Sequence, residues 1–324
     1  MSSAAAAQPQ SSISSLSRRL RGGDEVAWLI TLLFAISVLS VTALLVWELW
    51  IASEPSRARS GFGFITSRLW NPVTDEFGAY PFIYGTIVTS VLALVIAVPS
   101  GVGAAIYLSE LAGGMWSDVL TFLVELLAAV PSVIFGLLAM FTFVPLMRNV
   151  LGPAIQSVLG FLPIFSGPIF GVGYLTAGLV MSVMLFPYII SVSREALLAV
   201  PRDQREAALA LGATKWESTW QIVVPFARLG IIGSIFLAFA RALGETMAVT
   251  MVIGNDPAVH ASLFAPGYTI AAVIANEFTE ATTDTYLSSL YELGLVLLLV
   301  TILVNAAAQI MLKSMTGGGP VKVS

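Results

Sequence analysis

Six long apolar segments run through the sequence, and each one is long enough to cross a lipid bilayer as a helix. About 20 apolar residues are enough to span the hydrocarbon core. A chain with 57% hydrophobic and 10% charged residues is too apolar to hide this surface in a soluble core. The sequence therefore predicts an all-α integral membrane protein with about six transmembrane helices. The predicted spans are Val26–Ala52, Phe82–Leu108, Val119–Met147, Ile169–Val192, Trp220–Ile253 and Leu287–Leu312.

These spans divide the chain into four regions. Residues 1–25 are small and polar, and we expect a disordered cytoplasmic tail there. Residues 26–81 contain the first transmembrane helix and an outer loop, and this first apolar run is too long for a cleaved signal peptide. We expect the transmembrane core at 82–313 and a short cytoplasmic tail at 314–324.

Proline lies inside three of the predicted spans, at Pro99, Pro131 and Pro187. Each proline removes a backbone donor, so we expect each to kink its helix. The fifth span is too long for one upright helix, and we expect it to break near Gly230 or Gly233. Broken helices are tolerated where neighbouring helices or cavity water satisfy the freed carbonyls, so three prolines together favour a polar path. A simple packing kink is the alternative at each site.

The distribution of lysine and arginine predicts that both termini are cytoplasmic. Six spans place both termini on one side, and cytoplasmic loops are enriched in basic residues. The terminal side has ten basic residues and the other side has four. The ten are Arg18, Arg19, Arg21, Arg194, Arg202, Arg205, Lys215, Arg228, Lys313 and Lys322, and the four are Arg57, Arg59, Arg68 and Arg148.

Composition excludes several classes of function. The net charge of −4 argues against a nucleic-acid binder. The chain has no cysteine, and its single histidine, His260, falls in a predicted outer loop, so neither a metal cluster nor a Ser-His-Asp hydrolase can be assembled. The sequence has no G-x-x-x-x-G-K-[ST] loop and does not bind nucleotide in that way. We expect no cofactor and no metal in this chain.

One predicted cytoplasmic loop differs from the others. It reads SREALLAVPRDQREAALALGATKWESTWQIVVP and covers residues 193–225. The alanine-rich stretch from Arg205 to Leu211 predicts a helix, and Gly212 predicts its end. A second, amphipathic segment follows at Lys215–Val224. The loop is therefore predicted to form a helix–turn–helix that either packs on its own bundle or docks on another protein.

This loop resembles the EAA loop of binding-protein-dependent ABC importer permeases. The spacing matches that family at several fixed positions, although Val224 stands where leucine is frequent. The resemblance implies that the loop sits in a groove on a partner ATPase and couples ATP hydrolysis to movement of the helices. The residues expected to do this are Glu206, Ala207, Ala208, Gly212, Ile222 and Pro225.

Four stretches also resemble phosphate permeases of the PstC type: Trp70–Glu110, Glu125–Gly136, Ala210–Glu217 and Arg241–Asn255. The resemblance implies the MetI-like fold of type I ABC importers, in the plasma membrane of a prokaryote. It also implies a homologous PstA-type permease subunit, and two copies of a PstB-type ATPase that bind ATP and Mg. A PstS-type phosphate-binding protein would deliver phosphate from outside.

Arg241 and Glu245 place two charges inside the apolar fifth span. They are four residues apart, so we expect them to share a helix face and to pair. A charge at the bilayer centre costs roughly 3 kcal/mol, so such residues face a bundle interior or a wet cavity. A guanidinium can grip two oxygens of phosphate, so we expect Arg241 to contact the anion and Glu245 to moderate the grip. Thr246, Thr250 and Ser234 could add hydroxyl donors.

Other interpretations stay open at this point. Arg241 and Glu245 would also suit a structural pair that holds two helices in register. The same loop and spans would suit a permease for another oxyanion, such as molybdate or sulfate. A secondary transporter working without an ATPase, and an embedded structural subunit without its own path, are alternatives of different classes. The former predicts activity of this chain alone, and the latter predicts a dry interior around Arg241.

Overall fold

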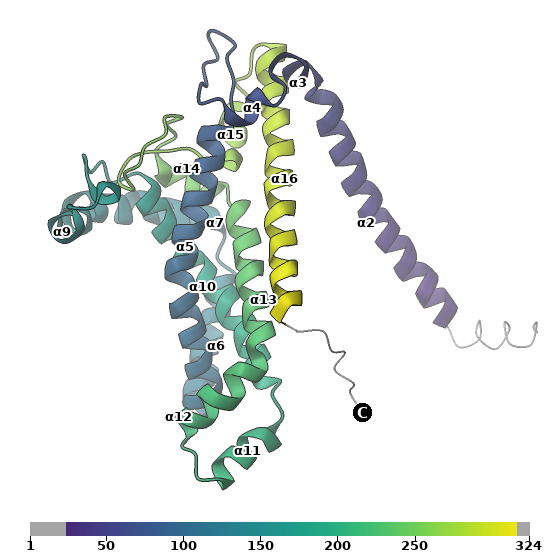
Figure 1. Ribbon diagram of the computed structural model, residues 1–324, viewed down its shortest axis with the longest axis vertical. Coiled ribbons are helices and arrows are strands. Elements are labelled where there is room, and N and C mark those ends of the chain that lie inside the picture. The colour runs from purple at the N-terminus through teal and green to yellow at the C-terminus, as the bar shows by residue number, and fades with distance from the viewer. Residues whose placement is uncertain (1–23, 316–324) are drawn as a thin grey trace, which may run out of the picture. The chain divides into compact units, whose positions relative to one another are not determined.

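The computed structural model describes residues 24–315, and the chain divides after Ala52 into two units (Figure 1). Two predicted regions lie largely outside the described residues. They are the N-terminal tail at 1–25, apart from its last two residues, and the C-terminal tail at 314–324, apart from its first two.

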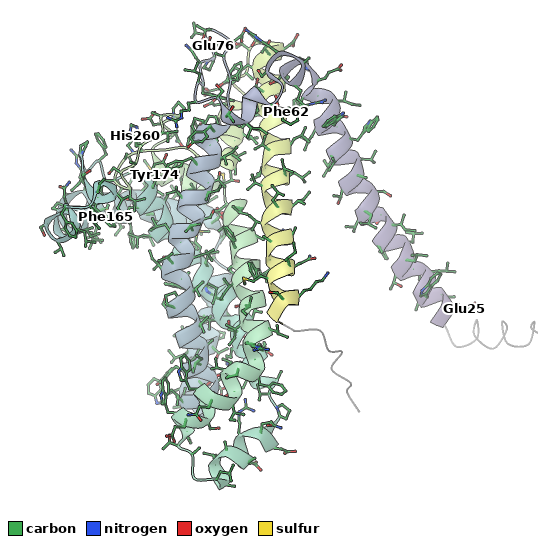
Figure 2. The ribbon with its side chains drawn as sticks, viewed as in Figure 1. Glu25, Phe62, Glu76, Phe165, Tyr174 and His260 are labelled. Atoms are coloured by element: carbon green, nitrogen blue, oxygen red, sulfur yellow. The ribbon has the colours of Figure 1, made fainter. Side chains whose placement is uncertain are left out.

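The first unit contains α2, Asp24–Ala52, a continuous helix of 29 residues. Figure 2 shows its side chains spreading on all sides. Apolar side chains are largely exposed along its length, for example Leu33 at 66%, Leu39 at 69% and Trp47 at 63%. A helix that is apolar all round is covered by lipid or by protein. The first predicted span is confirmed as a helix.

The second unit is also helical, and the residues that the structure describes contain only two isolated β-bridges besides helices and turns. The prediction of an all-α membrane protein with six candidate spans is confirmed. The helices and helical turns of this unit are α3 Glu54–Ser60, α4 Gly63–Thr66, α5 Tyr80–Ile106, η1 Tyr107–Leu111, α6 Gly114–Ala128, α7 Ser132–Leu138, η2 Ala139–Phe143, α8 Val144–Leu146, η3 Met147–Leu151, α9 Gly152–Leu159, η4 Pro163–Phe165, α10 Tyr174–Leu198, α11 Arg202–Ala210, α12 Lys215–Ser218, η5 Thr219–Val223, α13 Val224–Leu243, α14 Met247–Ile253, α15 Ile270–Glu277 and α16 Asp284–Met315.

The centre of the second unit is the contact between α5 and α10. Glycines let the two helices approach closely: a Cβ added to Gly101 would lie 2.8 Å from Ile189, and one added to Gly178 would lie 2.6 Å from Leu92. Small residues at helix interfaces allow such packing in membranes, where dispersion contacts replace the hydrophobic effect. Both Pro99 and Pro187 lie inside these uninterrupted helices, so neither of them breaks its span.

The third predicted span has the wrong bounds. The sequence predicts one helix over Val119–Met147, but α6 ends at Ala128 and a new helical stretch begins at Ser132 and continues to Leu159. Pro131 adopts an extended backbone at the start of α7, and the residue before a proline is disfavoured in helical conformation. The predicted outer loop at 148–168 is therefore helical over its first half.

The fifth predicted span breaks elsewhere than expected. A break near Gly230 or Gly233 is wrong, because α13 is continuous from Val224 to Leu243. Gly230 instead lets α13 approach α10, since a Cβ there would lie 2.3 Å from the Cβ of Ala196. The chain breaks after Leu243, and α14 begins at Met247.

The two ends of the second unit carry different structures. In Figure 1, α3, α4 and α15 gather at one end, whereas α11 and α12 lie at the opposite end. At the first end, the ring of Trp70 packs edge-on against Phe77 and Phe82, and its Nε1 donates to Glu277 Oε2 at 2.8 Å. The predicted outer loop before α5 is thus an ordered aromatic cap.

We predict that Gly85→Ala destabilises the fold, whereas Gly103→Ala on the same helix does not. A Cβ at Gly85 would lie 2.0 Å from the backbone oxygen of Tyr268, while nothing lies within 4 Å of one at Gly103. Overpacking of this kind costs about 1–3 kcal/mol. The thermal unfolding midpoint of each purified variant in detergent measures the effect, and equal midpoints for the two variants would contradict this packing.

Candidate anion path and coupling loop

Arg241 lies in the last turn of α13, and its side chain is exposed on the surface of this chain. Its guanidinium carbon lies 4.2 Å from the centre of the Tyr188 ring on α10. The face of an aromatic ring attracts a cation, and a stacked guanidinium keeps its donors free in the plane. Within residues 24–315 no protein acceptor takes a hydrogen bond from this guanidinium. Arg241 is therefore held by a ring while its N–H groups remain available.

Glu245 does not pair with Arg241, and the prediction that the two share a helix face is wrong. The helix ends at Leu243, and Glu245 lies beyond Gly244. Its Oε1 accepts a hydrogen bond from the backbone N–H of Ala248 at 3.3 Å, at the start of α14. None of the ion pairs within the described part of the chain joins the two side chains. Glycine is a poor helix former, and a carboxylate is favoured where a new helix begins.

The three predicted hydroxyl donors differ in burial. Thr246 and Thr250 are half-buried next to the break, and Thr250 donates to the carbonyl of Thr246 at 2.8 Å. Ser234 is buried, and its hydroxyl is 2.7 Å from that of Ser193 on α10. Ser234 therefore joins α13 to α10 rather than standing on the surface with Arg241.

The short helix that follows the break beside Arg241 packs against the short helix that begins after Pro131. A Cβ added to Gly136 on α7 would lie 2.6 Å from Met251 Sδ and 3.1 Å from Ala248 Cα on α14. Non-helical backbone at membrane depth is tolerated only where protein or a water-filled cavity satisfies its polar groups. Two half-helices in contact, with an exposed arginine beside them, are the geometry of a path or of a subunit seam.

The loop at 193–225 is a helix–turn–helix, as predicted. The first helix, α11, ends in a Schellman motif: Ala213 N donates to Ala208 O and Gly212 N donates to Leu209 O, at 3.2 and 3.0 Å. Gly212 has φ +90, a conformation that glycine adopts without strain. A capping box between Thr214 and Glu217 then starts α12.

The six predicted coupling residues do not all face the same way. Glu206, Ala207 and Gly212 are exposed, as is Pro225 near the start of α13. Ala208 is buried, and Ile222 is half-buried in η5. Nothing in the described chain lies within 4 Å of a Cβ built on Gly212, so its own fold leaves that side open.

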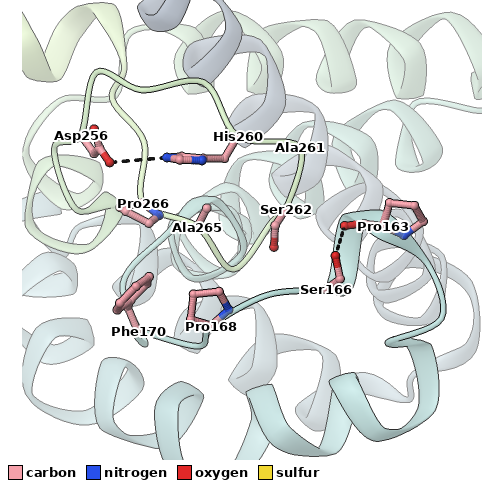
Figure 3. Close-up of a pocket in the computed structure, with 10 residues that line it drawn as sticks. All are labelled: Pro163, Ser166, Pro168, Phe170, Asp256, His260, Ala261, Ser262, Ala265 and Pro266. Carbon is pink, nitrogen blue, oxygen red and sulfur yellow. Dashed lines mark hydrogen bonds and ion pairs between the residues drawn. The ribbon is translucent and has the colours of Figure 1, made fainter.

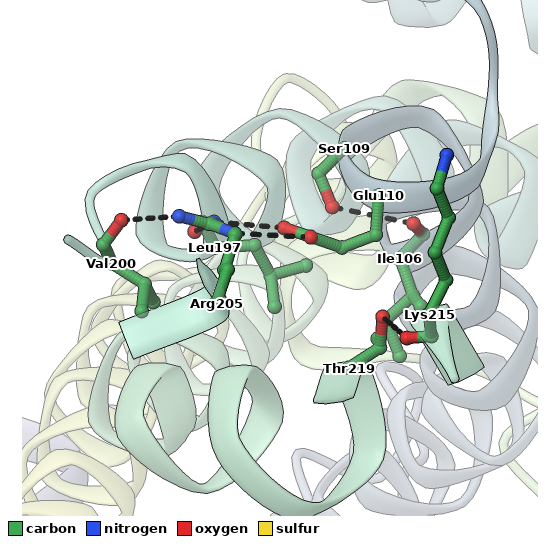
Figure 4. A network of polar contacts seen from close by, with 8 residues as sticks. All are labelled: Ile106, Ser109, Glu110, Leu197, Val200, Arg205, Lys215 and Thr219. Atoms are coloured by element: carbon green, nitrogen blue, oxygen red, sulfur yellow. Dashed lines mark hydrogen bonds and ion pairs between the residues drawn. The ribbon is translucent and has the colours of Figure 1, made fainter. Parts of the chain in front are cut away.

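Three further residues of these sites were missed by sequence reasoning. Tyr188 was not singled out, and Arg205 was counted only as a cytoplasmic charge. Arg205 pairs with Glu110, which lies 95 residues away at the end of the α5 stretch (Figure 4). An acidic residue at the end of a span is a signal for such a pair, but its partner cannot be found without the fold.

The opposite end of the unit has a cavity of about 560 Å³ between two loops (Figure 3). His260 Nε2 lies 3.5 Å from Asp256 Oδ2 at its rim, and the His260 side chain is 42% exposed. The wall is otherwise rich in proline, with Pro163, Pro168 and Pro266. The prediction of His260 as a loop residue is confirmed.

Comparisons with known proteins agree with these observations. Residues 97–317 match the family described as binding-protein-dependent transport system inner membrane component. A phosphate transport system permease protein PstC of Mesorhizobium japonicum is 43% identical over 91% of each chain. A PstC of Xylella fastidiosa strain Temecula1 is 47% identical over 78% of this chain and 79% of its own. The chain belongs to the PstC permease family.

A likeness to solved structures supports the same fold. A chain of a bacterial alginate ABC transporter, in complex with its periplasmic protein, aligns with a TM-score of 0.60 at 16% identity, over 93% of this chain and 100% of its own. Identity at this level shows the fold alone. The PstC-family chain therefore has the predicted type I ABC importer permease architecture and is a multi-pass membrane permease subunit.

We predict that Tyr188, and not Glu245, shields Arg241. Peptide mapping by mass spectrometry gives the rate at which phenylglyoxal modifies Arg241 in the folded protein. Tyr188→Leu should raise this rate about 2- to 5-fold, the equivalent of an exposed cation–π contact. Tyr188→Phe retains the ring and is the matched control. A faster rate in Glu245→Gln with no change in Tyr188→Leu would contradict the geometry.

Proposed function

We propose that this chain is one permease subunit of an ATP-driven inorganic phosphate importer, and that it forms the translocation path with a homologous, PstA-type subunit. The observation that carries the proposal is the exposed Arg241, which rests on Tyr188 with its donors free. The proteins named phosphate transport system permease protein PstC, at 43–47% identity, support the choice of phosphate.

Phosphate must give up part of its hydration shell to cross the membrane, and the arginine replaces some of it. The planar fork of a guanidinium matches two oxygens of a tetrahedral anion. The contact has to be weak enough for release, because conduction needs binding sites that the ion leaves. The carboxylate of Glu245, which lies at the start of α14 and not on the face of Arg241, limits by its negative charge how tightly an anion is held in the path. Thr246 and Thr250 complete the proposed path, and Thr250 reaches an anion by turning its hydroxyl away from the Thr246 carbonyl.

The energy for transport comes from partners in this proposal. Two copies of a PstB-type ATPase hold ATP and Mg, because this chain has no phosphate-binding loop. They dock on α11, where Glu206, Ala207 and Gly212 are exposed. Ala208 and Ile222 pack the loop against the rest of the chain, and Pro225 lies at its junction with α13.

The remaining partners follow from orientation. The end with α11 and α12 is cytoplasmic, as are both termini, in the plasma membrane of a prokaryote. A PstS-type binding protein delivers phosphate to the opposite end, where the loops around the His260 cavity lie. No nucleic acid takes part.

We predict that Arg241→Ala leaves the complex assembled but abolishes phosphate uptake in proteoliposomes. Arg241→Lys keeps the charge and loses the fork, so it should retain a small part of the uptake. Arg148→Ala is the matched control, since Arg148 is an exposed arginine in another helical stretch. Normal uptake by Arg241→Ala would remove the anion role.

In the wild-type complex, excess molybdate or sulfate should not compete with labelled phosphate, and effective competition would favour the rival oxyanion.

We predict that Gly212 acts through close approach to the ATPase as well as through its backbone. Asparagine tolerates positive φ better than alanine, and alanine is the smaller side chain. Gly212→Asn and Gly212→Trp should both lower the uptake per ATP hydrolysed, with the larger loss in Gly212→Trp. If Gly212→Asn matches wild type and Gly212→Ala does not, the backbone turn alone explains this glycine.

A further inference from the structure

Arg205 joins three elements of the fold with one side chain (Figure 4). It belongs to α11, and it donates to both carboxylate oxygens of Glu110 in η1: Nε lies 3.1 Å from Oε2 and Nη2 lies 2.8 Å from Oε1. The Arg205 and Glu110 side chains are 20% and 10% exposed. This is the bidentate geometry that makes arginine–carboxylate pairs strong and directional.

The same guanidinium also binds the C-terminal end of α10. Its Nη2 donates to the carbonyl of Leu197 at 2.7 Å, and its Nη1 donates to the carbonyl of Val200. The last carbonyls of a helix have no partner within the helix, so a cation there is favoured by hydrogen bonding and by the helix dipole. Arg205 thus ties α11 to the ends of both α5 and α10.

Apart from this side chain, α11 lies against η5 and α12 and buries little apolar surface. Ala208 is the only buried residue of α11. The apolar cluster beneath it joins α5, α10, η5 and α13 through Ala105, Leu197, Val223 and Ala227, with no member from α11. Since α11 contributes almost no apolar surface, its position depends on the polar contacts of Arg205.

The pair differs from the surface ion pair on the neighbouring helix. Arg194 Nη1 and Glu195 Oε1 are 3.7 Å apart, and the two side chains are 18% and 76% exposed, so the carboxylate of this pair lies in solvent. A solvated carboxylate at this distance contributes little, whereas removing one partner of a pair that is shielded on both sides leaves an uncompensated charge. Glu110 and Arg205 are therefore a rigid connection rather than a solvated contact.

We infer that Arg205 and Glu110 are positioning residues that make α5, α10 and α11 move as one body. This inference rests on the proposed function, because it needs a partner that pushes on α11. Movement of an ATPase against the exposed Glu206 and Gly212 then passes through Arg205 into α5 and α10. α10 carries Tyr188, on which Arg241 rests, so the connection reaches the proposed path.

The test is the amount of phosphate taken up per ATP hydrolysed by the complete complex in proteoliposomes. Glu110→Gln should lower this ratio about tenfold, within the usual range for coupling between two sites. Glu195→Gln, which removes an exposed charge from the same end of α10, should leave the ratio unchanged. Loss of folded complex reduces uptake and hydrolysis together, so the ratio separates coupling from stability. A wild-type ratio in Glu110→Gln would overturn the inference.

A second variant and a second measurement cover failure of assembly. Arg205→Lys keeps the charge and loses the fork, and it should give a ratio between wild type and Glu110→Gln. Hydrogen exchange of the α11 backbone amides, in the nucleotide-free complex, should be faster in both variants and unchanged in Glu195→Gln. Unchanged exchange and an unchanged ratio in Arg205→Lys would also overturn the inference. If the wild-type complex takes up no phosphate, the proposed function fails, whereas the exchange measurement needs no substrate and still decides whether Arg205 fixes α11.

Discussion

The structure depends on one constraint: inside a bilayer, the backbone has no water to hydrogen-bond with. Helices meet this constraint within a single segment, and departures from helix need protein or cavity water around them. The chain departs from helix twice in its core, before Ser132 and after Leu243. The two half-helices that follow, α7 and α14, pack against each other at Gly136.

Arg205 and Arg241 have different kinds of contacts. Arg205 makes four hydrogen bonds, to Glu110 and to carbonyls at the end of α10, and its side chain is mostly buried within its own fold. Arg241 lies on an aromatic face and keeps its donors open. A guanidinium whose N–H donors are taken up by the protein suits a permanent connection. One whose N–H donors are free suits a transient ligand.

The fold itself is shared well beyond close relatives. An alginate transporter chain has the same architecture at 16% identity, whereas proteins named as phosphate permeases share 43–47% identity with this chain. The helical framework is therefore retained where most of the sequence differs.

The sequence by itself determined the class of the protein, the number of spans and the helix–turn–helix at 193–225, because apolar length, alanine content and a stop glycine act locally. It did not determine where long apolar runs break. The predicted break near Gly230 or Gly233 was wrong, because a glycine serves equally well for close packing, and the neighbour that Gly230 meets is on α10. The partners of charges were decided only by the tertiary structure: Glu245 sits beyond a helix end, Arg241 finds a ring on α10, and Arg205 finds Glu110 across 95 residues. Spacing along the chain predicts which residues share a helix face, but electrostatic and stacking contacts form between whichever groups the packing of helices brings together.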